Sequence, residues 1–215
     1  DRTSMVVNEF ASEHPEVRLI RLAENHGKGH AVRSGVVNAR GKLVLFADAD
    51  AATPLSEVER LERAIAAGAD LAIGSRALDD HRVKVKARLY RRVMGRIFHG
   101  IVESLTVPGV KDTQCGFKLF QGPVAHDLFS RMRMRGFSFD VELLMMAQRR
   151  GDRIAEVPVN WTHQPGSKVN LVTDSARMVR DLFVIRGRYV RGEYNTPHVA
   201  PWSESAAEPL PTAPR

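Results

Sequence analysis

KLVLFADAD, residues 42–50, is the stretch that decides the fold, because an apolar run ends there in two carboxylates, Asp48 and Asp50. The run from Leu43 to Ala47 is typical of a strand covered on both faces in a parallel sheet. Ligands of open α/β sheets bind beyond the carboxyl ends of such strands. Two Asp side chains one residue apart offer oxygen ligands to Mg²⁺ or Mn²⁺, and that metal can hold a diphosphate. The alternative is a polar strand end followed by a helix cap.

The segments around this strand alternate between helical and strand patterns. The predicted elements are a helix at Met5–Ala11, a strand at Val17–Leu22, a helix at Gly29–Ala39, a helix that ends at Gly68, and a buried strand in DLAIGSR, residues 70–76. Thr53 is the expected hydroxyl cap of the helix that ends at Gly68, with Pro54 at its first position. This alternation predicts a βαβ layer with a parallel sheet.

After Arg76 the alternation changes. The expected elements are a strand within VKDTQCGFKLF (110–120), a helix opened by Pro123, a helix within FSFDVELLMMAQRR (137–150), a strand near Ile154–Trp161 and two amphipathic helices, Tyr90–Ile101 and Asp174–Arg191. The second amphipathic helix has an apolar stripe of Met178, Leu182, Ile185 and Tyr189. The segment from Thr196 is rich in Pro, Ala, Ser and Glu, and we expect it to be disordered. We therefore expect one domain over residues 1–195 and a tail over residues 196–215.

The positive charge of the chain has one local source. Net charge is +7, and seven Lys or Arg with no Asp or Glu lie between His81 and Val102. A helix face that is only solvated normally mixes signs, so this segment indicates contact with an anionic membrane surface. Nucleic acid is disfavoured because no aromatic platform accompanies the charge. A single cysteine, Cys115, excludes an internal disulfide.

Several side chains are candidates for phosphate contacts. Lys28 lies in a glycine-rich turn before a helix, where backbone amides and a lysine favour an anion, although the spacing is not that of a P-loop. Arg76 should emerge on the same sheet edge as the two carboxylates and can grip phosphate bidentately. Asp112 precedes Gly116, at which a ligand can approach the backbone closely. Lys168 follows a Pro-Gly turn; the alternatives for these residues are salt bridges, simple turns and solvated side chains.

Asp140 and Glu142 lie together in FSFDVELL (137–144), where Ser138 is the expected helix cap. Stabilisation of the helix dipole is a sufficient structural reason for both carboxylates. Since they are two residues apart on a helix, they point in different directions and at most one faces the site.

The chain contains, in this order, the segments ENHGKGHAV, LVLFADADAAT, AIGSR, VKDTQCGFKLF, FSFDVELL and EVPVNWTHQPGSK. With them it resembles the dolichyl-phosphate β-glucosyltransferases, from its first residues to about Tyr189. The resemblance implies an α/β fold of the glycosyltransferase-A (Rossmann-like) type, with a mixed, mainly parallel sheet flanked by helices. It implies UDP-glucose as the nucleotide sugar, Mg²⁺ or Mn²⁺, and inverting transfer to dolichyl or polyprenyl phosphate. The expected location is peripheral, at the cytoplasmic face of a membrane.

The resemblance also implies roles for individual residues. The family's motif for the metal and the nucleotide sugar is matched by Asp48 and Asp50. The turn near the donor is matched by Lys28, and a phosphate-binding arginine by Arg76. The sugar or acceptor side matches Asp112, Gln114 and Asp140. We therefore expect Asp50, Asp140 and Arg76 to be catalytic, and Lys28, Asp48, Asp112, Gln114 and Lys168 to bind substrate.

Members of this family begin with a strand, a helix and a second strand that carry a PAYNE-like segment and an acidic DDGS-like turn, which hold the base and ribose. This sequence starts at Asp1, after that turn, so we expect an N-terminally incomplete version that binds UDP poorly by itself. The alternatives are a transferase that uses GDP-mannose or another sugar nucleotide, a non-catalytic protein that binds a membrane surface, and a nucleic-acid-binding protein.

Overall fold

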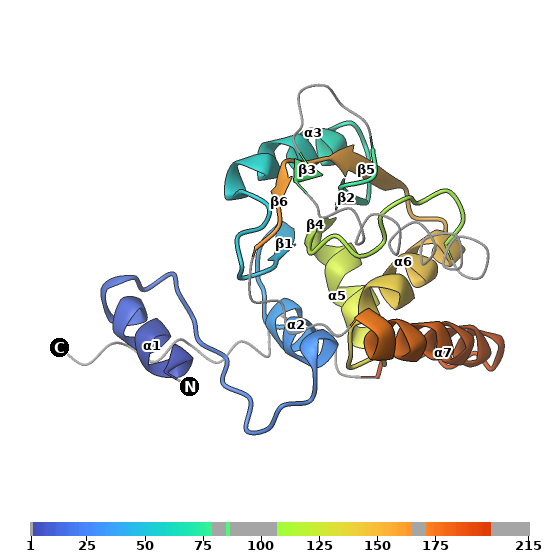
Figure 1. The fold of residues 1–215 in the computed structure, drawn as a ribbon, viewed down its shortest axis with the longest axis horizontal. Coiled ribbons are helices and arrows are strands. Elements are labelled where there is room, and N and C mark those ends of the chain that lie inside the picture. The colour runs from blue at the N-terminus through green and yellow to red at the C-terminus, as the bar shows by residue number, and fades with distance from the viewer. Residues whose placement is uncertain (1, 79–84, 87–106, 165–170, 199–215) are drawn as a thin grey trace.

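The computed structural model describes residues 2–78, 85–86, 107–164 and 171–198 (Figure 1). The helices are α1 (Thr3–Glu13), α2 (Lys28–Val36), α3 (Val58–Ala66), α5 (Gly122–Arg131), α6 (Phe139–Arg150) and α7 (Leu171–Val190), with a 3-10 turn, η1 (Leu55–Glu57). The strands are β1 (Leu43–Ala47), β2 (Leu71–Ser75), β3 (Val85–Lys86), β4 (Phe117–Gln121), β5 (Ile154–Pro158) and β6 (Trp161–Thr162).

Four of these strands form the main sheet, in the order β1-β4-β2-β5. β2 and β5 are parallel, whereas β4 lies between β1 and β2 and is antiparallel to both. β1 and β2 therefore run in the same direction without touching, and the sheet is mixed. A second, two-stranded sheet pairs β3 with β6 in parallel.

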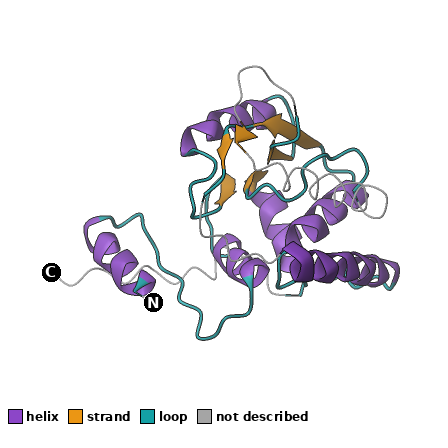
Figure 2. Cartoon of the chain, viewed as in Figure 1, coloured by secondary structure: helices purple, strands orange, loops and turns teal. Residues whose placement is uncertain are grey.

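Helices cover both faces of the main sheet (Figure 2). β4 shows why: Phe117 and Leu119 belong to the core shared with α3, while Phe120 belongs to the core shared with α2, α5, α6 and α7. Successive side chains of a strand point to opposite faces, so this one segment serves two cores. Lys118 alternates with them and is buried on the second face, at 0% exposure.

The sequence predicted most elements near their observed positions. The helix at residues 5–11, the strand at 42–47, the buried strand in 70–76 and the helix in 137–150 are confirmed as α1, β1, β2 and α6. The strand expected at Val17–Leu22 is wrong, because none of the described strands lies beside it to pair its backbone. This segment follows α1, which lies to one side of the body in Figure 1 and has no buried residue.

Helix caps differ from expectation at two places. Pro54 occupies the cap position of η1 and Thr53 gives no cap bond, so the chain enters α3 through a 3-10 turn. Ser138 holds the cap position of α6, yet its hydroxyl donates to Oδ2 of Asp181 in α7 at 2.9 Å. The local sequence thus identified where the helices begin. The hydroxyl of Ser138 makes a tertiary contact instead of a cap bond.

Two further expectations are settled in the C-terminal half. The strand expected near 154–161 is two strands, since β5 ends at Pro158 and β6 pairs in the other sheet. In α7 the predicted apolar stripe is buried at Met178, Leu182 and Ile185. Tyr189 is 39% exposed, and its ring centroid lies 5.0 Å from the guanidinium carbon of Arg149. The amphipathic helix expected at 90–101 lies outside the described residues, as does nearly all of the tail.

No helix in the described parts of the chain is both long and apolar enough to span a bilayer.

Candidate active site

The antiparallel strand β4 brings the candidate residues to one sheet edge. Because β4 runs against β1 and β2, its first residue lies at their carboxyl ends, and Ala47 pairs with Phe117. The loop that precedes β4 therefore meets the turns that follow the other two strands. The predicted common edge for Asp48, Asp50 and Arg76 follows from the shared direction of β1 and β2.

Asp48 is held on two sides. Its backbone N–H donates to the carbonyl of Gly116 at 2.8 Å, which continues the β1–β4 ladder by one bond. Its Oδ1 lies 2.7 Å from the ammonium of Lys28, at the start of α2. Both side chains keep about a third of their surface exposed, 35% for Asp48 and 29% for Lys28, so they are accessible to a ligand.

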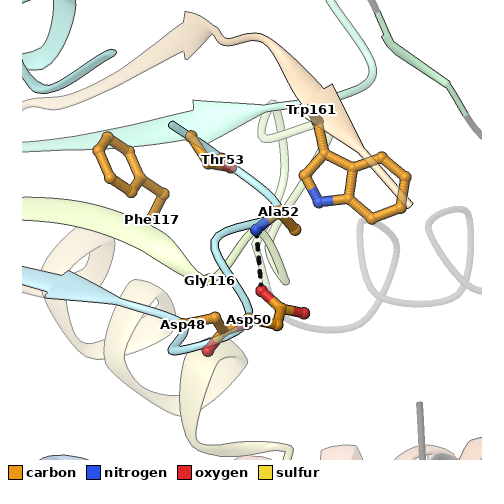
Figure 3. A pocket seen from close by; sticks show the side chains of 7 residues that line it. All are labelled: Asp48, Asp50, Ala52, Thr53, Gly116, Phe117 and Trp161. Carbon is orange, nitrogen blue, oxygen red and sulfur yellow. Dashed lines mark hydrogen bonds between the residues drawn. The ribbon is translucent and has the colours of Figure 1, made fainter. Parts of the chain in front are cut away.

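Asp50 closes the turn and faces a pocket (Figure 3). Its Oδ1 accepts the N–H of Ala52 at 3.0 Å, and Ala51 between them has a positive φ of 53°. A left-handed alanine is a strained conformation, and such residues cluster at functional sites. The pocket is lined by Asp48, Asp50, Ala52, Thr53, Gly116, Phe117 and Trp161.

A buried ion pair lies beside Phe46 of β1. Nζ of Lys118 is 2.5 Å from Oδ1 of Asp140 and 2.6 Å from the carbonyl oxygen of Cys115. Burial raises the pKa of Asp140, and the charges of Lys118 and Lys28 oppose that rise. The ammonium groups of Lys28 and Lys118 lie 5.4 and 5.9 Å from the centroid of the Phe46 ring. Two acids and two lysines thus gather around the end of β1.

Arg76 and Asp112 form a second, bidentate pair. Nε and Nη2 of Arg76 donate to the two Asp112 oxygens at 2.7 and 2.8 Å, and the Arg76 backbone N–H adds a bond of 2.9 Å. Burial by itself raises the pKa of Asp112, but the charge and hydrogen bonds of Arg76 outweigh it, so the pKa lies below its usual value. The guanidinium also lies 5.4 Å from the ring centroid of Trp161, which connects this pair to the pocket wall.

The other predicted residues are placed differently. The side-chain amide of Gln114 donates to Sδ of Met178 in α7 at 3.7 Å. Glu142 points away from Asp140, as the helical spacing predicts, and is fully buried. Lys168 lies outside the described residues. Cys115 is packed, and burial raises its pKa to about 12.

Sequence reasoning missed Trp161 and Lys118 as members of the site. Lys118 was signalled only as a lone cation within the apolar strand FKLF. Trp161 is the first residue of β6, and nothing in the local sequence shows that its ring reaches the pocket lined by Asp48 and Asp50.

The carboxylates of Asp48 and Asp50 suit a divalent cation whose other ligands come from a bound substrate. Within the described residues, no three His, Cys, Asp or Glu side chains are grouped to hold a metal. Mg²⁺ is commonly bound by one or two carboxylates together with substrate phosphates. The bare Cα of Gly116 leaves room for the Asp48 carboxylate, and the exposed Asp50 carboxylate follows in the same turn. Asp48 and Asp50 therefore fit a metal held jointly with a phosphate ligand.

Solved structures share this fold. The crystal structure of glucosyl-3-phosphoglycerate synthase from Mycobacterium tuberculosis in complex with Mn²⁺, UDP and glucosyl-3-phosphoglycerate superposes with a TM-score of 0.58. Sequence identity is 18%, and the match covers 95% of this chain and 74% of that one. The expected mixed, glycosyltransferase-A-like fold is thereby confirmed.

Curated proteins related by sequence have a higher identity to this chain than that solved structure has. The chain is 40% identical over 199 residues to the dolichyl-phosphate beta-glucosyltransferase of Dictyostelium discoideum, covering 89% of this chain and 61% of that protein. It is 39% identical over 202 residues to that of Homo sapiens, covering 90% and 62%. The chain thus spans about three fifths of the length of these relatives. The family model described as glycosyl transferase family 2 matches residues 1–129, and the chain belongs to this family.

Proposed function

We propose that this chain carries the catalytic domain of a glycosyltransferase that moves glucose from UDP-glucose to dolichyl or polyprenyl phosphate, with inversion and with Mg²⁺ or Mn²⁺. The names of the relatives at about 40% identity support the sugar and the lipid acceptor. For UDP and Mn²⁺, the support is the crystal structure of a protein that shares this fold and contains both ligands.

The observation that carries the proposal is the contact between Lys28 and Asp48 at the carboxyl end of β1. The buried pair of Lys118 and Asp140 is near it, since both lysines lie against the ring of Phe46. A nucleotide sugar has a diphosphate that needs cationic partners and a sugar that needs fixed polar partners. For the diphosphate, the site supplies a partly exposed lysine and two carboxylates that can hold a divalent cation. For the sugar, it supplies an oriented carboxylate.

Asp48 and Asp50 would hold the metal, which when bound neutralises negative charge on the departing diphosphate. Lys28 lies beside Asp48 and would contact the same phosphates. Arg76 is held by Asp112 with two donors, so its phosphate contact would use the remaining face of the guanidinium.

The acceptor determines what Asp140 has to do. A phosphate oxygen is already anionic, so its attack on the sugar C1 requires no strong general base, unlike attack by a sugar hydroxyl. Asp140 is 3% exposed and in contact with Lys118, an arrangement suited to orienting a sugar or acceptor group. Displacement from the side opposite the diphosphate inverts the configuration at C1.

A lipid-linked acceptor requires access to a membrane surface. The cationic segment between His81 and Val102 supports peripheral contact with anionic lipid at the cytoplasmic face. Nearly all of that segment lies outside the described residues, so its charge alone supports this part of the proposal.

Transfer of labelled glucose from UDP-glucose to dolichyl phosphate in Mn²⁺ tests the proposal. We expect lipid-linked glucose with the unmodified chain, and only background with Asp50→Asn. Glu59→Gln is the matched control, because Glu59 is an exposed carboxylate of α3, away from the pocket. Undiminished transfer by Asp50→Asn would overturn the metal assignment.

Two further arms separate the alternatives. Competition by GDP rather than UDP would favour the GDP-mannose transferase. Sedimentation with anionic liposomes, without transfer of any sugar, would favour a membrane-binding protein.

A further inference from the structure

Glu142 is a fully buried carboxylate whose two oxygens are both occupied. Its Oε2 accepts the backbone N–H groups of Arg133 and Met134 at 3.0 and 2.8 Å. Its Oε1 accepts the hydroxyl of Tyr194 at 2.7 Å. The helix-dipole explanation does not require these three bonds, since stabilisation of a dipole depends on charge and position rather than on partners from other segments. Glu142 thus ties α6 to the loop between α5 and α6 and to the segment after α7.

The same loop, residues 132–138, ends against α2 on its other side. The carbonyl of Arg135 accepts the N–H of His30 at 3.2 Å, and the carbonyl of Met132 accepts Nη1 of Arg33 at 3.1 Å. The first N–H groups of a helix have no partner within it, and α2 has no side-chain cap, so the Arg135 carbonyl serves as one.

The loop backbone packs so closely against the start of α2 that Gly27 and Gly29 have no room for a side chain. A Cβ added to Gly27 would lie 2.5 Å from the Arg135 carbonyl oxygen, and one added to Gly29 would lie 2.7 Å from that of Met134. Lys28 lies between these two glycines, and its ammonium contacts Asp48. The position of the loop backbone therefore fixes the backbone from which Lys28 reaches the site.

From these contacts we infer that Glu142 is a positioning residue, which holds the loop 132–138 against the start of α2 and thereby keeps Lys28 on Asp48. Glu142 does not touch a substrate in this arrangement. Its effect passes through two peptide N–H groups, one carbonyl and the first turn of α2.

The proposal is tested with Glu142→Leu, which removes the acceptor for both loop N–H groups, and with Glu142→Gln, which keeps an oxygen for them. Ser138→Ala is the matched control, because it removes the partly buried hydrogen bond to Asp181 of α7 but none of the bonds from the loop to α2. We expect faster hydrogen exchange at the His30 amide in Glu142→Leu, and protection retained in Glu142→Gln and Ser138→Ala. Unchanged protection in Glu142→Leu, or an equal loss in Ser138→Ala at equal stability, would overturn the inference.

A second measurement follows the effect to Lys28 and rests on the proposed function, because it uses UDP with excess Mn²⁺ as the probe. Glu142→Leu should weaken UDP binding by about tenfold, but by less than about twofold in a Lys28→Ala background, since coupled residues are not additive. Losses that multiply would contradict the path through Lys28. No UDP binding by the unmodified chain would count against the proposed function, while the exchange experiment would still decide the inference.

Discussion

The carboxylate of Asp48 occupies the space in which a side chain of residue 116 would lie. A Cβ added to Gly116 would be 2.0 Å from Oδ2 of Asp48 and 2.2 Å from its Cγ. The two residues also share a backbone hydrogen bond of 2.8 Å. The sequence predicts that Gly116 lets a ligand approach the backbone, and in the structure the side chain of Asp48 makes that approach.

Gly116→Ala should therefore displace the Asp48 carboxylate from the metal turn. We expect affinity for Mn²⁺, measured by electron paramagnetic resonance with excess UDP, to fall about tenfold or more, as for loss of one charged ligand. Gly35→Ala is the control, because Gly35 lies in α2 with no atom within 4 Å of an added Cβ. It should keep Mn²⁺ affinity and stabilise the helix by about 0.5–1 kcal/mol. Equal Mn²⁺ affinity in both variants would contradict the proposed fit.

Lys118→Met should leave Asp140 buried without its cation. Breaking a buried pair by removing one partner costs about 3–5 kcal/mol of the free energy of unfolding, which urea denaturation measures. Adding Asp140→Asn should restore part of the loss, since the uncompensated charge disappears. Arg63→Ala removes an exposed pair with Glu59 and should change stability by less than about 0.5 kcal/mol. A comparable loss from Arg63→Ala would refute the special cost of the buried pair.

The pair of Arg76 and Asp112 should make stability depend on pH in the acid range. Because the pKa of Asp112 is lowered in the folded chain, its contribution is present above the ordinary value of 3.8 and is lost as the pH falls through the lowered value. Asp112→Asn should therefore be less stable than the unmodified chain at pH 6, and the difference should shrink below pH 3.8. Urea unfolding at several pH values measures it, with Glu59→Gln as control. A difference that stays constant with pH would exclude this linkage.

Trp161 should report on the metal directly. It lines the pocket with Asp48 and Asp50, so paramagnetic Mn²⁺ bound there should quench its fluorescence, whereas Mg²⁺ should not (Figure 3). Trp161→Phe should abolish the quenching, and Trp202→Phe, which changes the other tryptophan, should retain it. Quenching that survives Trp161→Phe would place the metal elsewhere.

The parts of the fold that the sequence predicted are those with local causes. Gly68 and Gly151 follow α3 and α6 with φ of 103° and 89°, a conformation that glycine adopts without strain. The apolar run of β1 and the two Asp after it indicated the position of the candidate site. The prediction of a strand at Val17–Leu22 was wrong because a strand requires a neighbouring strand, and the apolar pattern of one segment does not show whether a neighbour is present.

The sequence by itself determined which charged groups this protein has and that Asp48, Asp50 and Arg76 follow strands. Only the tertiary structure decided the partners: Lys28 with Asp48, Lys118 with Asp140, and Arg76 with Asp112. The physical reason is the antiparallel insertion of β4 between β1 and β2, whose register places Lys118 and Gly116. Strand order depends on burial on both faces of the whole sheet, and no segment of the sequence records that by itself.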